Sequence, residues 1–139
     1  MKSPFTYDPG LGEAEAEAMW MVDAPGRVIV AAADGGDVVG TANMYANRAG
    51  PGAHIGSASY MVNAAHRGRG VGRALVVDSL SWARACGFGG MQFNAVAETN
   101  THAVRLYETL GFTVLGTVPG GFRHPLNGDV GLHKMFCPL

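Results

Sequence analysis

The feature that most constrains this chain is a glycine- and arginine-rich run between a strand-like and a helix-like segment. The run, Arg67-Gly68-Arg69-Gly70-Val71-Gly72-Arg73, has glycine at every second position and holds three of the ten lysine and arginine residues. An apolar β-like segment, 58–62, precedes it, and a helix-like segment, 74–85, follows. Glycines let consecutive backbone N–H groups face one concavity, and a helix start adds the positive end of its dipole. The pattern therefore predicts a phosphate site at which arginine side chains supply full charge.

Two well-known glycine loops do not fit this run. A Walker loop ends in Gly-Lys-Ser/Thr, and the run contains no lysine. A dinucleotide fingerprint spaces its glycines as Gly-x-Gly-x-x-Gly, whereas here the spacing is Gly68-x-Gly70-x-Gly72. The run instead resembles the pyrophosphate loop of the GCN5-related N-acetyltransferases, Arg/Gln-x-x-Gly-x-Gly/Ala, at each specified position.

Length and composition indicate one domain that covers 1–139. The chain has 139 residues, of which 47% are hydrophobic and 15% charged, with a formal net charge of −1. That charge gives no reason to expect nucleic acid or an anionic membrane as a partner. An apolar run near 18 residues and a signal-peptide core are both absent, so we expect a cytoplasmic protein. Cys86 and Cys137 have no motif spacing and are expected to be free thiols.

Hydrophobic periodicity and turn residues predict an alternation of helices and strands after an irregular lead-in, 1–10. The predicted elements are a helix at 11–22, strands at 27–33, 38–46 and 54–62, a helix at 70–86, a strand at 91–96, a helix from Thr99 or Asn100 to Leu110, a strand at 112–118, a loop at 119–127 and a closing strand at 129–136. A meander that runs into βαβ units predicts an α/β fold with a mixed sheet and helices on both faces. The acetyltransferase fold has this order, but its full form begins with another strand and helix, and too few residues precede Leu11 to supply them.

A second block of residues resembles the late helix of the same family, Asn-x-x-Ala-x-x-Leu-Tyr-Glu-x-x-Gly-Phe. The matching positions are Asn100, Ala103, Leu106, Tyr107, Glu108, Gly111 and Phe112. Asn100 and Tyr107 are seven residues apart, which is two helical turns, so both can face the same groove. Read without the family, Tyr107 is a half-buried core aromatic and Asn100 a helix cap.

The resemblance implies acetyl-CoA as the cofactor and assigns the parts of its site. In the family the sheet splays near the end of the strand predicted at 54–62, around Val62, and the pantetheine arm lies in the gap. Main-chain groups of Met61 and Val62 would then pair with the arm, and Asn100 would hydrogen-bond it. The diphosphate would lie on the loop residues Arg67, Gly68, Arg69, Gly70, Val71, Gly72 and Arg73. Tyr107 would protonate the departing thiolate, and backbone N–H groups near Val62 would stabilise the thioester oxygen.

The group that removes a proton from the incoming amine is left open by the sequence. Candidates are Glu98, His54, His66 and a water molecule held by Asn94. Glu98 is equally explained as an acid in the first turn of a helix. Asn94 is either a satisfied structural amide or a substrate-positioning one. His102, His124 and His133 have no spacing typical of a metal site, so we expect no metal.

A narrower resemblance covers about the last three fifths of the chain. The segment 93–100, with 115–119 after the helix, is similar to fungal acetyltransferases that act on azetidine-2-carboxylate and other proline analogues. This implies that Asn94 and Asn100 handle the substrate and take part in catalysis. Arg123, in the loop that would flank the acceptor, is either a carboxylate partner or a solvated arginine. Weaker candidates for acceptor contacts are Asn43, Tyr45, Ser57 and Ser59.

Three functional hypotheses remain at this point. The first is acetylation of a small-molecule amine, with an amino or imino acid as the narrower expectation. The second is acetylation of a protein N-terminus or lysine, for which we find no acidic cluster that would attract a cationic acceptor. The third is an acyl-CoA-binding module without catalysis. A homodimer is left open.

Overall fold

The computed structural model describes residues 10 and 12–139. Its elements are α1 (Glu13–Trp20), β1 (Arg27–Ala32), β2 (Val38–Ala46), η1 (Gly50–Gly52), β3 (Ile55–Val62), η2 (Ala64–His66), α2 (Val71–Ala85), β4 (Gly90–Ala97), α3 (Thr101–Thr109), β5 (Thr113–His124) and β6 (Gly128–Pro138). Among the described residues, no helix is long and apolar enough to cross a membrane.

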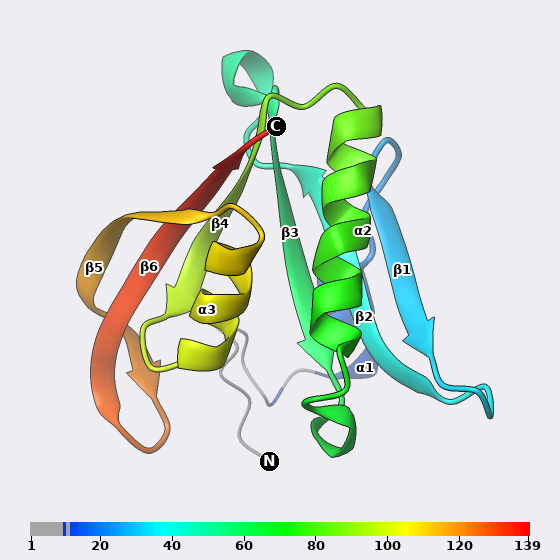
Figure 1. Ribbon diagram of the computed structural model, residues 1–139, viewed down its shortest axis with the longest axis horizontal. Helices are drawn as coiled ribbons and strands as arrows, with labels where there is room; N and C mark the ends of the chain where they lie inside the picture. The colour runs from blue at the N-terminus through cyan, green and yellow to red at the C-terminus, as the bar shows by residue number, and fades with distance from the viewer. Residues whose placement is uncertain (1–9, 11) are drawn as a thin grey trace.

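The six strands form one mixed sheet in the order β1-β2-β3-β4-β6-β5. Strands β1, β2 and β3 form an antiparallel meander, β3 and β4 run parallel, and β6 pairs antiparallel with both β4 and β5. Helices α2 and α3 lie in front of the sheet in Figure 1, and α1 lies behind it. The predicted mixed sheet with helices on both faces is therefore confirmed.

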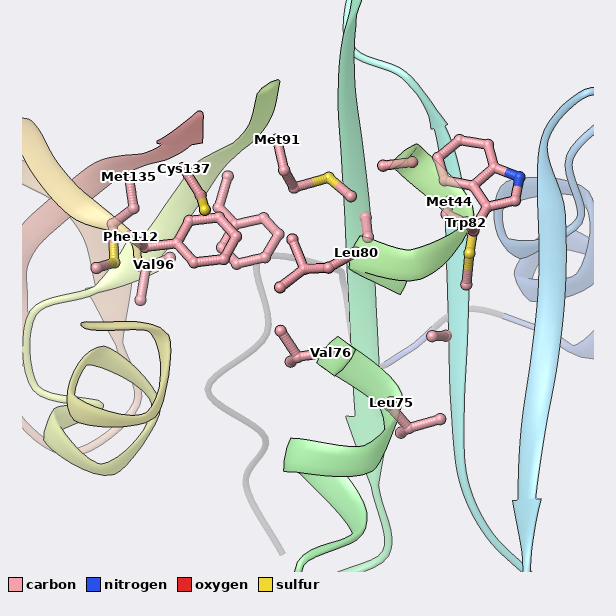
Figure 2. Close-up of a cluster of buried hydrophobic side chains, with 14 residues drawn as sticks. Met44, Leu75, Val76, Leu80, Trp82, Met91, Val96, Phe112, Met135 and Cys137 are labelled. Carbon is pink, nitrogen blue, oxygen red and sulfur yellow. The ribbon is translucent and has the colours of Figure 1, made fainter. Parts of the chain in front are cut away.

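The core lies between α2 and the front face of the sheet (Figure 2). The buried positions of α2 recur at steps of three and four residues, which places them on one side of the helix. These positions are Leu75, Val76, Ser79, Leu80, Trp82 and Ala83. At the other end of the core Phe112 stacks on Phe93, with ring centroids 4.3 Å apart, and α3 packs over this pair through Tyr107.

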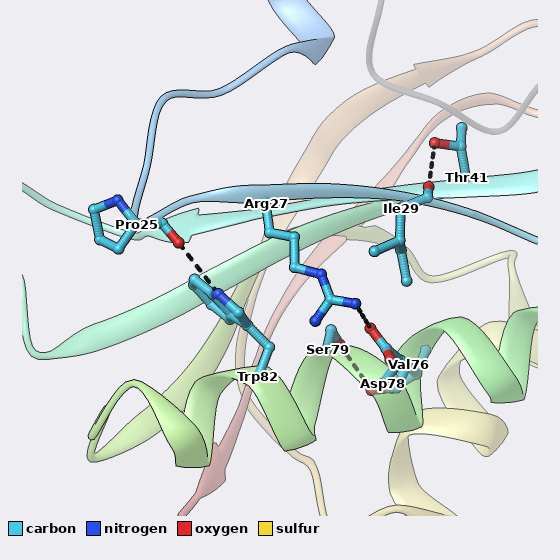
Figure 3. Close-up of polar contacts among 8 residues, drawn as sticks. All are labelled: Pro25, Arg27, Ile29, Thr41, Val76, Asp78, Ser79 and Trp82. Carbon is cyan, nitrogen blue, oxygen red and sulfur yellow. Dashed lines mark hydrogen bonds and ion pairs between the residues drawn. The ribbon is translucent and has the colours of Figure 1, made fainter.

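Polar contacts attach α2 to the start of β1 (Figure 3). The indole N–H of Trp82 donates to the carbonyl of Pro25 at 3.2 Å, and Arg27 lies 3.7 Å from Asp78. Close packing then fixes the other end of the helix, because a Cβ on Gly40 would lie 2.9 Å from Val71 Cγ1. Any larger residue at position 40 would push the first turn of α2 away from β2.

Most element boundaries differ from the prediction by one or two residues, and two segments need comment. The first helix spans Glu13–Trp20, shorter than 11–22; Leu11 and nearly all of the expected lead-in lie outside the described residues. The predicted loop at 119–127 is wrong, because β5 continues to His124 and the turn is shorter. A register shift between Val118 and Phe122 absorbs Pro119 and Gly120, whose φ is +62°. Proline is tolerated there since β5 is an edge strand and needs no second ladder.

Strands β3 and β4 separate soon after they meet. Within the part of the chain that the structure describes, they pair only through Ile55 with Gly90 and Gly56 with Met91. Beyond this point the two strands diverge, as Figure 1 shows. The splay expected from the family resemblance is therefore present, and it leaves the rest of β3 with one unpaired edge.

Candidate functional site

The glycine-rich run forms an open turn at the start of α2. Gly68 and Gly70 have φ angles of +75° and +80°, a left-handed conformation that residues with a Cβ seldom adopt. A Cβ built on either residue would have no heavy atom within 4 Å, so both positions face open space. This conformation exposes the main chain of the turn to a ligand.

The first turn of α2 lacks a partner of its own for its backbone N–H groups. Its N-cap residue is Gly70, which has no side chain to accept a hydrogen bond, and the first turn contains no acidic residue. A helix start of this kind binds anions through its free N–H groups and its dipole. Among the described residues, ion pairs join only Arg27 with Asp78 and Arg123 with Asp129. The guanidinium groups of Arg67, Arg69 and Arg73 are therefore free to contact an anion.

A cleft of about 890 Å³ opens beside this turn. One wall comes from β3 and the start of α2, and the other from α3 and the β5–β6 turn. The lining residues are Tyr60, Val62, His66, Arg67, Gly68, Gly70, Val71, Gly72, Arg73, Val76, Thr99, Asn100, His102, Ala103, Leu106, Tyr107, His124 and Leu126. Aspartate and glutamate are absent from this lining, which favours an anionic ligand in the cleft. Of the predicted loop residues, Arg69 is exposed but does not line the cleft.

The free edge of β3 presents alternate residues to the gap. The amide of Asn47 donates to Ile55, and that of Asn63 donates to Val39, both at 2.8 Å in one uninterrupted register with β2. Alternation along an antiparallel pair then directs the amide of Met61 toward Thr41 on β2. The amides of Tyr60 and Val62 face the gap instead. The expectation that main-chain groups of Met61 would pair with a ligand in the gap is therefore wrong. The same expectation for Val62 fits the geometry.

Tyr107 closes the cleft on the α3 side. Its ring packs against Phe93, Phe112 and Tyr60, with centroid distances of 4.7, 5.8 and 6.3 Å. Burial raises the pKa of Tyr107 to about 12, so its hydroxyl stays protonated at neutral pH. The hydroxyl has no hydrogen-bond partner among the described residues, and it is free to donate to a ligand. Asn100 caps α3, with Oδ1 accepting from the amide of Ala103 at 3.4 Å, and also lines the cleft.

Tyr60 is a cleft residue that the sequence reasoning missed. Its hydroxyl contacts Ser79, whose own hydroxyl donates to the carbonyl of Val76, so Tyr60 donates to Ser79. Burial raises the pKa of Tyr60. The signal was available in the sequence, because Tyr60 and Val62 are two apart on a strand and must share a face.

Asn94 lies at an irregularity of β4, and its side chain is hydrogen-bonded to Gln92 and Asn47. The β4–β6 register shifts between Phe93 and Val96, which makes a bulge at Asn94. Gln92 Nε2 donates to Asn94 Oδ1 at 2.9 Å, and Asn94 Nδ2 donates to Asn47 Oδ1 at 2.7 Å. Both ends of the Asn94 amide thus have a protein partner. Asn47 and Gln92 were not predicted to belong to the site.

The weaker acceptor candidates share the opposite side of the sheet. Asn43, Tyr45, Ser57 and Ser59 alternate with the core residues of β2 and β3, so they face α1 rather than α2. Asn43 is 2% exposed; its Oδ1 accepts from the amide of Ser59 and its Nδ2 donates to the carbonyl of Trp20. Ser57 is also buried, and the hydroxyls of Tyr45 and Ser59 are 3.4 Å apart. None of the four lines the cleft, and neither does Asn94, which follows the core residue Phe93 and therefore shares their side of the sheet.

Arg123 is placed away from the cleft. Its Nε donates to Asp129 across the β5–β6 hairpin at 2.9 Å, and 87% of its side chain is exposed. The pair raises the pKa of Arg123 and lowers that of Asp129. Of the two interpretations of Arg123, the solvated arginine fits this position, and an acceptor contact in the cleft does not. Its neighbour His124 does line the cleft, with Nδ1 accepting from the amides of Leu126 and Asn127.

The candidate bases are placed as follows. Glu98 accepts from the amide of Gly131 at 2.7 Å and so joins the end of β4 to β6. His54 contacts the carbonyl of Pro51, outside the cleft. His66 lines the cleft, but its Nδ1 is buried without a partner among the described residues. Over the same residues, no three His, Cys, Asp or Glu side chains gather in a way that could hold a metal ion.

Comparison with known proteins gives a consistent result. Residues 2–112 match the model of the acetyltransferase (GNAT) family. The chain is similar to the structure of a GCN5-related N-acetyltransferase from Kribbella flavida, with 55% identity and a TM-score of 0.93, over 97% of this chain and 82% of that one. It is also similar to yncA from Salmonella typhimurium, whose structure contains its cofactor acetyl-CoA, with 29% identity and a TM-score of 0.72, over 90% and 69% of the two chains.

A curated relative matches over a shorter segment. N-acetyltransferase aca1 of Schizosaccharomyces pombe is 38% identical over 65 residues, which are 47% of this chain and 31% of that protein. The match therefore spans less than a third of the length of this relative.

Proposed function

The chain belongs to the GNAT acetyltransferase family, and on that premise we propose that it transfers the acetyl group of acetyl-CoA to the amine of a small amino or imino acid. The observation that carries the proposal is the uncapped start of α2, which opens into a cleft bounded by the free edge of β3 and by Tyr107. The start of α2 suits a diphosphate, the free edge of β3 suits an extended arm, and Tyr107 suits a departing thiol.

The residues at the cleft fit acetyl-CoA in charge and in shape. Free backbone N–H groups at Gly70–Gly72 and the side chains of Arg67 and Arg73 would hold its diphosphate. The amides and carbonyls of Tyr60 and Val62 face the gap, so they would pair with the pantetheine arm as a neighbouring strand would. When bound, acetyl-CoA supplies a thioester whose acyl carbon accepts the amine.

Preorganised donors at the β3 edge would stabilise negative charge on the thioester oxygen. The amides of Tyr60 and Val62 are held by the β2–β3 ladder on one side and are unpaired on the other. Such donors need no rearrangement when charge develops, and removing one from other acyl-transfer sites costs about 3 kcal/mol of transition-state stabilisation.

Tyr107 acts best as a hydrogen-bond donor to the departing sulfur. Its pKa of about 12 exceeds that of a free thiol, about 8.5, by roughly 3.5 units. Complete transfer of its proton to the thiolate would therefore cost about 5 kcal/mol. The net reaction removes a proton from the amine and adds one to the thiol. Tyr107 Oη can stabilise the sulfur while the acceptor nitrogen supplies the proton that finally resides there.

The acceptor side favours a small neutral or anionic partner over a cationic one. The cleft has arginine and histidine side chains in its walls but no carboxylate that would attract a lysine-rich peptide. The resemblance of 93–100 to fungal enzymes that act on proline analogues points the same way. We assign Asn94 and Asn100 to acceptor handling on this basis, with a water molecule on Asn94 as the route by which the amine loses its proton.

Calorimetry and a panel of amines test the proposal. Acetyl-CoA should bind, and thiol release should accelerate with members of a panel of L-amino acids, L-proline and L-azetidine-2-carboxylate. Spermidine and a peptide with a free N-terminus serve as cationic comparisons. Turnover of the peptide alone would replace the proposal with protein acetylation. Tight binding without turnover of any amine would replace it with a non-catalytic acyl-CoA-binding module.

A further inference from the structure

Three side-chain amides form a continuous hydrogen-bonded chain beside the gap between β3 and β4. Gln92 Nε2 donates to Asn94 Oδ1, and Asn94 Nδ2 donates to Asn47 Oδ1. Asn47 follows β2, whereas Gln92 and Asn94 are on β4, so the chain spans the strand that separates them. All three residues are partly buried.

The position of Asn94 makes its orientation important for a ligand in the gap. It lies three residues beyond Met91, the last residue of β4 that pairs with β3 among the described residues. The bulge in β4 includes Asn94 and Ala95, and bulges commonly re-aim a side chain next to an active site. An asparagine amide has two N–H donors and two acceptor positions. One donor and one acceptor position of Asn94 therefore remain for a ligand.

We propose that Asn47 and Gln92 are positioning residues that fix which end of the Asn94 amide meets the acceptor. Gln92 occupies the oxygen end as a donor, and Asn47 occupies the nitrogen end as an acceptor. A flip of Asn94 alone would turn its N–H groups toward Gln92 Nε2 and lose both bonds, so Asn94 reverses only if Gln92 and Asn47 reverse with it. Each net hydrogen bond changes the equilibrium for a flip of Asn94 alone by roughly three- to tenfold, so the orientation of Asn94 is coupled to the orientations of Gln92 and Asn47. The role of this orientation in catalysis rests on the proposed function; the orientation itself does not.

Two isosteric substitutions separate orientation from charge. Asn47→Asp leaves only an acceptor at position 47, so it preserves the observed direction of the chain. Gln92→Glu leaves only an acceptor at position 92, so Asn94 must turn its N–H groups toward Glu and accept from Asn47. Both variants add one negative charge next to Asn94. A simple charge effect would change both alike, whereas an orientation effect would change Gln92→Glu alone.

Hydrogen exchange of side-chain amides, followed by NMR, measures the direction without a substrate. In Gln92→Glu the Asn47 side-chain NH2 becomes a donor, and its exchange should slow by about tenfold relative to the wild type. In Asn47→Asp the Gln92 NH2 should stay protected. Unchanged exchange at Asn47 in the Gln92→Glu variant would overturn the inference.

Steady-state kinetics then measures the effect on the acceptor, with whichever panel amine is turned over fastest. Gln92→Glu should raise KM for this amine by about tenfold or more, and Asn47→Asp by less than about threefold. Asn47→Leu removes one of the two bonds and leaves the bond from Gln92, so it should raise KM by less than Gln92→Glu. Gly35→Asp, which adds the same charge in the exposed β1–β2 turn, is the control and should leave KM unchanged.

Equal increases in Gln92→Glu and Asn47→Asp would refute the positioning role. A reversed amide chain with unchanged KM would refute it as well. If the wild type acetylates no amine of the panel, the proposed function fails, and the exchange data still decide whether Gln92 and Asn47 orient Asn94.

Discussion

Replacing Gly70 by aspartate should separate the electrostatics of the phosphate site from its backbone geometry. Gly70 is the N-cap of α2, with φ +80° and ψ 6°, and a Cβ there would project into open space. Asparagine and aspartate are isosteric, and both tolerate left-handed φ better than other residues with a side chain. Gly70→Asn and Gly70→Asp therefore share a backbone cost of about 1–2 kcal/mol and differ only in charge.

The expected difference follows from Coulomb's law. A carboxylate about 4 Å from a phosphate charge is repelled by about 1 kcal/mol in water and by about 4 kcal/mol at an effective dielectric constant of 20. Gly70→Asp should therefore bind acetyl-CoA about 5- to 1000-fold more weakly than Gly70→Asn. The ratio should shrink as salt is added, because the cleft is open to solvent.

Isothermal titration calorimetry at two ionic strengths measures this ratio, and urea denaturation confirms that both variants remain folded. Gly36 provides a matched control pair. It lies in the β1–β2 turn with φ +89°, a Cβ there would also meet open space, and it does not line the cleft. Gly36→Asp and Gly36→Asn should bind acetyl-CoA equally well. If Gly70→Asp and Gly70→Asn also bind alike within about twofold, the diphosphate does not lie at the start of α2.

Three other changes test separate parts of the structure. Tyr107→Phe should slow thiol release by about 100-fold at unchanged affinity for acetyl-CoA, as measured by single turnover and calorimetry, and wild-type turnover would exclude Tyr107 as the donor to sulfur. Raising the pH from 10 to 12 should lower the free energy of unfolding by about 2–3 kcal/mol through Tyr107 alone, because the unfolded tyrosine ionises near pH 10 and the folded one near 12. Denaturant titrations at several pH values measure this loss, and it should be smaller in Tyr107→Phe. An identical loss of unfolding free energy in the variant would contradict the raised pKa. Glu98→Gln keeps an acceptor for the amide of Gly131, so stability and the pH profile of kcat should both persist, whereas loss of activity would identify Glu98 as the base.

Much of the fold follows from local sequence signals. The prediction was within one or two residues for β2, and for β3 and α2 on either side of the glycine-rich run. The signals used there, alternation, three- and four-residue spacing and glycine stops, are local properties of the sequence. The exception was β5. Its Pro119-Gly120-Gly121 segment has the composition of a loop, yet pairing with β6 keeps it extended on both sides of a bulge.

The site divides in the same way. Gly68, Gly70, Asn100 and Tyr107 could be identified from sequence, because their spacing around a helix start or along one helix face already places them in one groove. Met61 was misassigned, because the direction of a strand's amides depends on its register with its neighbour. The sequence left Arg123 open between an acceptor contact and a solvated arginine, because its ion-pair partner, Asp129, is supplied by the other strand of a hairpin.

The sequence by itself determined where the glycine turn and the uncapped helix start lie, since both are properties of consecutive residues. Only the tertiary structure decided which polar groups meet beside the gap between β3 and β4. Asn47 and Asn94 are 47 residues apart and meet because β3 and β4 separate and β4 bulges at that point. Hydrogen bonds between distant strands depend on register and twist, and neither can be read from local composition.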